Sequence, residues 1–196
     1  MPIVRLPEGD LRDEIRNPLY DTVDLTGALS GTTYNFFSSV LNKTLAQTNL
    51  KQNGQLETAV SFRVQGLALD AQNVVSTESF VLPIILERSS IRLHIGEKDY
   101  WSGPARFAAG RVQQNAAFDA SAAPTYALLQ QYGWAAVQGV MFSAKHVVDI
   151  NPLQSFFMQW IIDTIDATNA ARATVTVGEV LKAVGSLKGL LRRPVQ

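Results

Sequence analysis

The amino-acid sequence predicts an all-β protein, an antiparallel sandwich of two sheets, because short stretches alternate between apolar and polar residues. A period of two places apolar side chains on one face of a strand and polar ones on the other. The alternation is clearest in three stretches: residues 60–64, 91–95 and 140–144. It predicts a core that includes Phe62, Val64, Leu93, Phe142 and Met158.

A change of phase at Gly66 is the second observation behind this prediction. Phe62 and Val64 are apolar before the glycine, whereas Leu67 and Leu69 are apolar after it. A slip of one residue would turn the second pair away from the core, so we expect a bulge or bend at Gly66. Bent strands of this kind are typical of sandwiches and rolls.

Composition is consistent with one domain that associates with itself. The chain has 196 residues, of which 46% are hydrophobic and only 17% are charged, with a net charge of zero. A thinly charged, neutral surface favours association and gives no general attraction to nucleic acid or anionic membranes. There is no cysteine, no signal-peptide pattern and no apolar run of the roughly 20 residues that span a bilayer.

Residues 1–30 are expected to form an N-terminal arm, and residues 31–196 a single domain. Within the arm, Gly9–Arg16 is compatible with one or two helical turns ending before Asn17–Pro18. The arm has little of the apolar periodicity that is typical of a core strand. It carries Leu19, Tyr20 and Leu25, which are candidate contacts to a neighbouring subunit.

The domain is expected to consist of strands separated by turns. Turn signals occur at Asn53–Gly54, at 96–98 and at Asn151–Pro152. The predicted strands are Tyr34–Leu41, Ala59–Leu69, Ile91–Ile95, Asp99–Trp101, Val137–Asp149, Ser155–Asp163, Ala173–Val177 and Leu187–Val195.

Two segments are candidates for helix. Pro124–Tyr132 begins with a proline suited to a first turn and is followed by Gly133. Val180–Leu191 has a helical apolar face but follows a strongly β-forming stretch, so strand, short helix and loop all stay open before the final strand.

No residue pattern points to catalysis, a metal or a cofactor. His94 and His146 lie on different predicted strands without ligand spacing, and the glycines of 27–31 lack the lysine of a phosphate loop. The acidic pairs Asp21 with Asp24 and Asp163 with Asp166 are explained by solvation. The tail arginines are a weak phosphate signal, and Trp101, Trp134 and Trp160 suit core or interface positions better than stacking on sugars or bases.

The stretch 155–162 is apolar on both strand faces. Phe156, Met158, Trp160 and Ile162 form one face, and Phe157 and Ile161 lie on the other. A strand of a two-layer sandwich has one inner side, so we expect Phe157 and Ile161 to be buried by a neighbouring chain. The competing interpretation is an intrachain cover by Pro124–Tyr132 or Val180–Leu187.

The run from Gly31 to Asp70 resembles the opening of jelly-roll capsid proteins of icosahedral, membrane-containing bacteriophages. The resemblance lies in an aromatic strand (Tyr34, Phe36, Phe37), a Thr48–Leu50 turn, a Gly54–Leu56 entry and the strand around Phe62. Later pieces similar in kind are IRLHIGEKDYWSGPARF, DINPLQSFFMQW and LKGLLRRPVQ. Because the chain is long enough for only one jelly roll, the nearer comparison is with small single-jelly-roll major capsid proteins.

The resemblance implies a structural virion protein, not an enzyme, that assembles with copies of itself and with other capsid proteins. It implies a location in the capsid after assembly in the host cytoplasm, in some relatives above an internal membrane, without sequence-specific nucleic-acid binding. The alternative from the residues is a β-sandwich recognition module that binds carbohydrate or a receptor. A third hypothesis is a small β-rich enzyme using carboxylates.

Overall fold

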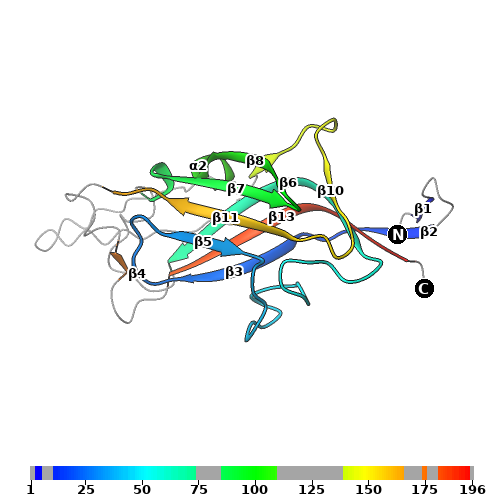
Figure 1. Ribbon diagram of the computed structural model, residues 1–196, viewed down its shortest axis with the longest axis horizontal. Helices are drawn as coiled ribbons and strands as arrows, with labels where there is room; N and C mark the ends of the chain where they lie inside the picture. Colours follow the sequence, from blue (N-terminus) through cyan, green and yellow to red (C-terminus); the bar gives the residue numbers. More distant parts are fainter. Residues whose placement is uncertain are drawn as a thin grey trace, which may run out of the picture.

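Two antiparallel sheets packed against each other form the body of the protein (Figure 1). The computed structural model describes residues 3–5, 11–73, 85–109, 139–165, 174–175 and 181–194, and all structural statements concern these residues. The described part is mostly strand, with short helical segments at 85–87 and at α2 (Ala105–Ala108). The all-β, two-sheet prediction is therefore confirmed.

The larger sheet has seven strands, and the order β3-β13-β6-β10 runs across its body. β1 and β2 extend it along the far end of β13, and β9 pairs with β6 beside β10. Its strands are β1 (Ile3–Arg5), β2 (Leu11–Arg16), β3 (Leu19–Leu25), β6 (Ser61–Asn73), β9 (Val140–Met141), β10 (Val148–Ile150) and β13 (Leu181–Pro194).

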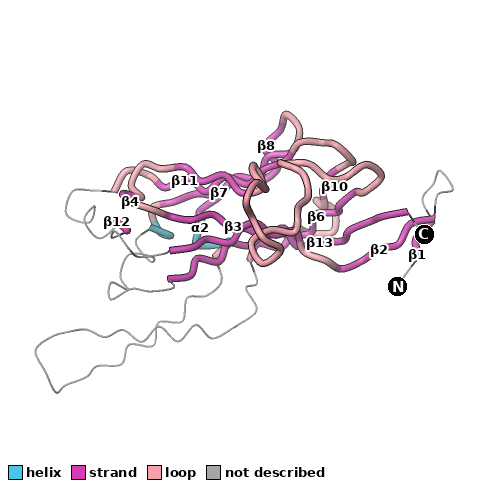
Figure 2. Tube along the Cα trace, turned by 90° about the horizontal axis from the view of Figure 1, so that it is seen from below, coloured by secondary structure: helices cyan, strands magenta, loops and turns pink. Residues whose placement is uncertain are grey.

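The smaller sheet has four strands in the order β5-β11-β7-β8. They are β5 (Thr33–Phe36), β11 (Phe156–Ile162), β7 (Ser89–Ile95) and β8 (Lys98–Pro104). A separate two-stranded pairing joins β4 (Gly27–Ala28) to β12 (Thr174–Val175). Figure 2 shows the two main sheets as two layers, with a large loop crossing in front of their middle.

β13 is the longest strand and the spine of the larger sheet. One edge pairs with β6 along almost its whole length, and the other pairs first with β3 and then with β2. Leu187 is opposite Leu19 and Leu190 is opposite Arg16, so the interruption between β2 and β3 falls at Asn17–Pro18. Proline lacks an N–H for the ladder, which explains the break at this point.

The predicted irregularity at Gly66 is confirmed. Lys188 pairs with Gly66 and Gly189 with Val64, so Gln65 is the extra residue of a bulge in β6. The bulge returns Leu67 and Leu69 to the core, and both are buried. β9 packs closely here, since a Cβ on Gly66 would lie 2.4 Å from the carbonyl oxygen of Val140.

The core lies between the two sheets, where the alternating residues converge. β7 and β11 bury every second residue, as their sequences predict. Four of the five predicted core residues are fully buried: Phe62, Val64, Leu93 and Met158. The fifth prediction needs correction: β9 ends at Met141, and Phe142 is only half-buried beside the core.

The two sheets pack tightly against each other at Gly185 of β13. A Cβ at this position would lie 2.3 Å from the Met158 methyl carbon and 2.7 Å from Cγ of Phe36. Phe36 and Met158 belong to β5 and β11 of the other sheet, where they pair with each other. The absent side chain of Gly185 thus leaves the space that two large core side chains fill.

The expected boundary between arm and domain at residue 30 is corrected by β3. Leu19–Leu25 pairs with β13 in the larger sheet, and Leu19 and Leu25 are buried in the core. The helical turns considered for Gly9–Arg16 are also wrong, because Leu11–Arg16 forms β2. Pairing with the end of β13 overrides the weak local helix signal.

The remaining sequence predictions agree with the structure in varying degree. β7 and β8 form the expected hairpin at 96–98, where Gly96 has a positive φ of 64°, and a turn at Asn151–Pro152 separates β10 from β11. The predicted strand Val137–Asp149 is two short strands with a loop between them. Val180–Leu191 is strand from Leu181 onward, and Pro124–Tyr132 lies outside the described residues.

Gly185→Ala should lower the free energy of unfolding by about 1–3 kcal/mol, because the added methyl overlaps the Phe36 ring, which cannot swing away as a methionine end can. Urea unfolding followed by tryptophan fluorescence measures the change. Ser186→Ala, at the next residue on the opposite face, is the control and should change stability by less than about 0.5 kcal/mol. Equal stability of the two variants would contradict the close approach of the sheets.

Candidate interaction surfaces

The described residues contain no group of three or more His, Asp and Glu side chains that could hold a metal ion. His94 Nδ1 lies 2.8 Å from Oδ1 of Asp99, and His146 Nδ1 lies 2.5 Å from the Ser143 hydroxyl. Each histidine thus has a local partner, and the structure does not bring the two histidines into one such cluster.

The candidate interface residues of the arm are in fact held by their own chain. Leu19 and Leu25 are buried between the sheets, so they are not available to a neighbouring subunit. The Tyr20 hydroxyl donates to the carbonyl oxygen of Leu45, and the Tyr20 backbone N–H donates to Asn49 Oδ1 at 3.0 Å. This part of the interface prediction is corrected: the three residues attach β3 to the core and to the loop that follows β5.

Phe157 and Ile161 lie on the outer face of the four-stranded sheet, opposite the buried face of β11. Both are half-buried. The Phe157 ring stacks on His94, with centroids 4.6 Å apart and planes 22° apart. One proposed cover, Val180–Leu187, is wrong because Leu181–Leu187 belongs to β13 of the other sheet. The other proposed cover, Pro124–Tyr132, lies outside the described residues. Their burial by a neighbouring chain stays a prediction.

Around these two residues the outer face is polar. Asn35 and Gln159 hydrogen-bond to each other across β5 and β11 at 3.0 Å. Arg92 lies opposite Gln159 on β7 and is exposed. The face therefore has two apolar side chains surrounded by amide and charged side chains. Protein interfaces have a similar arrangement, with an apolar centre and a polar rim.

A buried ion pair fixes the loop between β5 and β6. Asp21 of β3 is 0% exposed, and both of its carboxylate oxygens accept from Lys43 Nζ, at 2.7 and 2.9 Å. Oδ2 also accepts the backbone N–H of Phe37 at 2.6 Å. The expectation that Asp21 is a solvated acid is wrong: its charge is compensated inside the protein.

Further hydrogen bonds attach the same loop along β3. Thr48 forms an isolated bridge with Asp21, and its hydroxyl donates to the Tyr20 carbonyl at 3.1 Å. Asn49 Nδ2 donates to the Pro18 carbonyl at 2.8 Å. The loop is thus built onto the sheet edge, yet Leu41 and Leu45 within it are 76% and 75% exposed.

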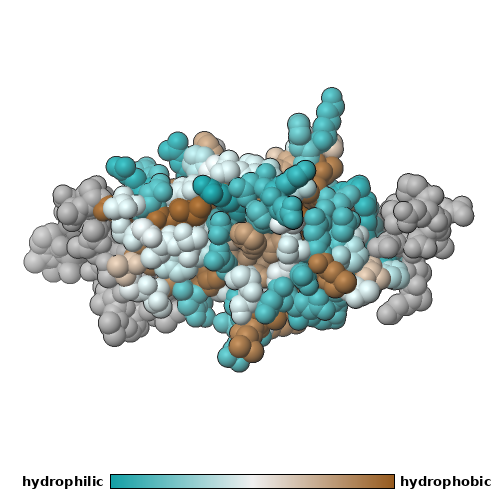
Figure 3. All heavy atoms as spheres, viewed as in Figure 1, coloured by the Kyte–Doolittle hydropathy of each residue, from teal (hydrophilic) through white to brown (hydrophobic). Residues whose placement is uncertain are grey.

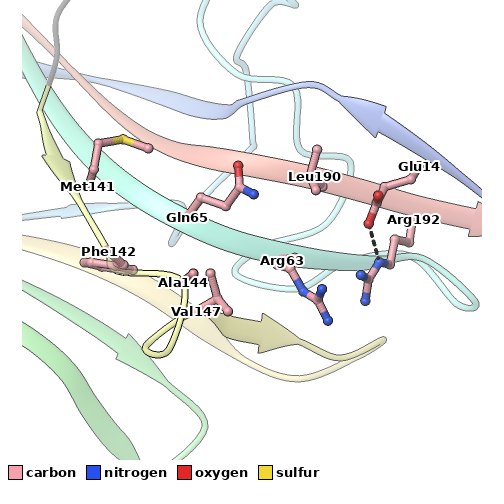
Figure 4. Close-up of a pocket in the computed structure, with 9 residues that line it drawn as sticks. All are labelled: Glu14, Arg63, Gln65, Met141, Phe142, Ala144, Val147, Leu190 and Arg192. Carbon is pink, nitrogen blue, oxygen red and sulfur yellow. Dashed lines mark hydrogen bonds and ion pairs between the residues drawn. The ribbon is translucent and has the colours of Figure 1, made fainter. Parts of the chain in front are cut away.

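An open depression of about 530 Å³ lies on the outer face of the seven-stranded sheet (Figure 4). Arg63 forms a bidentate pair with Asp149, at 2.9 and 3.2 Å, and this hydrogen bonding raises the pKa of Arg63. Arg192 donates from Nε to Glu14 at 2.9 Å. The lining residues are Glu14, Arg63, Gln65, Met141, Phe142, Ala144, Val147, Leu190 and Arg192.

The tryptophans give no exposed stacking platform in the described part of the chain. Trp160 is fully buried, and its indole N–H donates to the Ser89 hydroxyl at 2.8 Å. Trp101 is half-buried against the core, with its ring over Gly103. Trp134 lies outside the described residues. The tail arginines are occupied by carboxylates, since Arg192 pairs with Glu14 and Arg193 lies 4.0 Å from Asp13.

Comparisons of the chain with protein-family models, with curated proteins and with solved structures find no match. In the described residues, no helix has the length and apolar character needed to cross a membrane.

Lys43→Met should destabilise the protein by about 3–5 kcal/mol, because it leaves the Asp21 carboxylate buried without a counter-charge. Urea unfolding measures this loss. The double variant Asp21→Asn, Lys43→Met removes both charges and keeps an oxygen that accepts from Phe37, so it should recover much of the stability. Lys51→Met, which breaks the exposed pair with Glu57, is the control and should have little effect. Wild-type stability of Lys43→Met would refute the buried pair.

Proposed function

We propose that the sandwich is a jelly roll, and the observation that supports this is its nested strand pairing. The earliest core strand, β3, pairs with the last, β13; β5 pairs with β11, β6 with β10, and β7 with β8. Each successive pair lies in the alternate sheet. A two-stranded antiparallel ribbon of four successive strand pairs, wound around itself, produces this order, and eight strands in a double sheet with two Greek keys define the jelly roll.

We propose that the protein is a structural component of an icosahedral bacteriophage capsid and assembles with copies of itself and with other capsid proteins. Jelly rolls of eight strands occur in viral capsids, so the nested pairing supports this proposal by analogy of fold. The run from Gly31 to Asp70, whose strand and turn pattern resembles the opening of phage capsid proteins, is consistent with the same proposal. In this proposal the protein works without catalysis or a cofactor.

The surface of the molecule is consistent with assembly. The chain has no net charge, so like copies do not repel one another strongly. The described residues include exposed large apolar side chains, among them Leu41, Leu45, Phe107, Met141 and Leu153. Figure 3 shows scattered hydrophobic atoms on the face turned to the viewer. Beyond the core, β1, β2 and the end of β13 project from the sandwich (Figure 1). In the described part of the arm, β1 and β2 are therefore the strands that extend beyond the sandwich.

The proposal is tested by the size of the purified chain. Light scattering after size exclusion and negative-stain electron microscopy should show oligomers or shells whose abundance rises with protein concentration. A stable monomer that binds a glycan array would instead support the recognition module. Turnover of a glycan substrate would support the enzyme hypothesis, and either result would count against a capsid role.

Phe157→Asp with Ile161→Asp should leave a folded, soluble monomer that no longer forms large assemblies. Burial of a Phe or Ile contributes roughly 1.5–3 kcal/mol, and a shell repeats that gain at every equivalent contact. Circular dichroism checks folding, and light scattering checks assembly.

The matched control adds the same two negative charges at other exposed apolar residues, Phe107→Asp with Leu153→Asp. It should assemble if the outer face of the four-stranded sheet is the contact. Unfolding of the Phe157, Ile161 variant would indicate an internal cover instead, and normal assembly would remove this face from the interface.

A further inference from the structure

β1 and β2 form an antiparallel strand pair that is attached to the body of the protein through β13. One edge of β2 pairs with β13, and the other edge pairs with β1. Figures 1 and 2 show both strands at one end of the molecule, beyond the sandwich. We refer to β1 and β2 together as the N-terminal strand pair.

The described side chains of β2 do not contribute to the core. They are those of residues 13–16, and none of them belongs to the hydrophobic cluster between the sheets. On β3, by contrast, Leu19 and Leu25 are buried there. Asn17 and Pro18 separate the two strands, and both are exposed where the ladder with β13 is interrupted. Separation of β2 from β13 therefore breaks ladder bonds without removing a described β2 side chain from the core.

An ion pair attaches β2 to β13 through side chains. Arg192 Nε donates to Glu14 Oε1 at 2.9 Å (Figure 4), and these two side chains are only 11% and 16% exposed. A second pair, Arg193 with Asp13, is longer at 4.0 Å, and its arginine side chain is 49% exposed. Ion pairs shielded from water are screened less than exposed ones. The Glu14–Arg192 pair is therefore the stronger of the two attachments.

Glu14 is the end of a row of four charged side chains that crosses the sheet. Arg192 Nη1 lies 4.0 Å from Asp149 Oδ1, and Asp149 forms the bidentate pair with Arg63. Glu14 comes from β2, whereas the other three side chains come from β13, β10 and β6. When β2 leaves, Arg192 keeps the more distant Asp149 but loses its close partner. A largely buried charge without a close partner is unfavourable, and this penalty opposes the separation of β2.

We propose that the N-terminal strand pair opens as a separate unit, by a movement at Asn17–Pro18, and that the Glu14–Arg192 pair controls how often it opens. Segments with few buried apolar contacts open at a lower free energy than the core does. The body keeps its own core between the two sheets, so it stays folded when β2 leaves β13. The inference concerns a single chain, and it holds whether or not copies assemble into a capsid.

Hydrogen exchange followed by mass spectrometry tests the proposal on the full chain, at a low protein concentration that favours the monomer. In the wild type, the amides of β2 should exchange roughly a hundredfold faster than those of β6, because exchange in the core requires global unfolding. Glu14→Gln preserves the size of the side chain and removes its charge. It should speed exchange in β2 by about tenfold and leave exchange in β6 unchanged.

Asp24→Asn is the matched control, because it removes a carboxylate that lies 3.7 Å from Lys182 of the same strand, β13. This variant should leave exchange in β2 unchanged. Equal exchange rates of β2 and β6 in the wild type would overturn the separate opening. The role of the ion pair would be overturned by an unchanged rate in Glu14→Gln, by an equal increase in β2 and β6, or by an equal effect of Asp24→Asn.

Discussion

One buried carboxylate, that of Asp21, connects the three parts of this molecule. It belongs to β3 of the seven-stranded sheet, accepts the backbone N–H that follows β5 of the four-stranded sheet, and pairs with Lys43 of the connecting loop. Phe37 has a positive φ of 68°, a conformation unusual for a residue with a side chain. Its N–H donates to Asp21 and its carbonyl accepts from the Gly54 N–H, each at 2.6 Å, so both backbone groups of Phe37 are bonded where the chain leaves the small sheet for the loop.

The Asp21–Lys43 pair contributes more to the position of the loop than to the free energy of unfolding. An apolar replacement of a buried ion pair is often as stable as the pair itself, because the gain from pairing is offset by the loss of solvation. An apolar replacement would lack specific hydrogen bonds, whereas the carboxylate of Asp21 accepts from both Lys43 Nζ and the Phe37 N–H. Together with the hydrogen bonds of Tyr20, Thr48 and Asn49, the pair therefore attaches the loop to β3.

The strands that form the two sheets can be predicted from the sequence because the pattern that identifies each strand lies within a few neighbouring residues. Alternation predicts which face of β7 and β11 is buried, and the change of phase at Gly66 predicts the bulge, since both depend on neighbouring residues. The same pattern does not identify β3 as a core strand, because Leu19–Leu25 enters the core only by pairing with β13, more than 150 residues away in the chain. The burial of Asp21 is not predicted for the same reason, because no pattern in the sequence around Asp21 indicates that Lys43 is its ion-pair partner.

The surfaces were harder to predict than the core, and the reason is geometric. A strand pattern shows that Phe157 faces away from Met158, but it does not show that His94 of the next strand covers part of its ring. The depression on the seven-stranded sheet is lined by residues of β2, β6, β9, β13 and the loop after β9, five segments that no single stretch of sequence contains. Its charges are also distributed across segments, and each is paired with a partner from another strand. The outer face of the seven-stranded sheet thus carries charged side chains that are paired with one another around a partly apolar depression. Because opposite charges are paired within one chain, two identical copies of this face repel each other little.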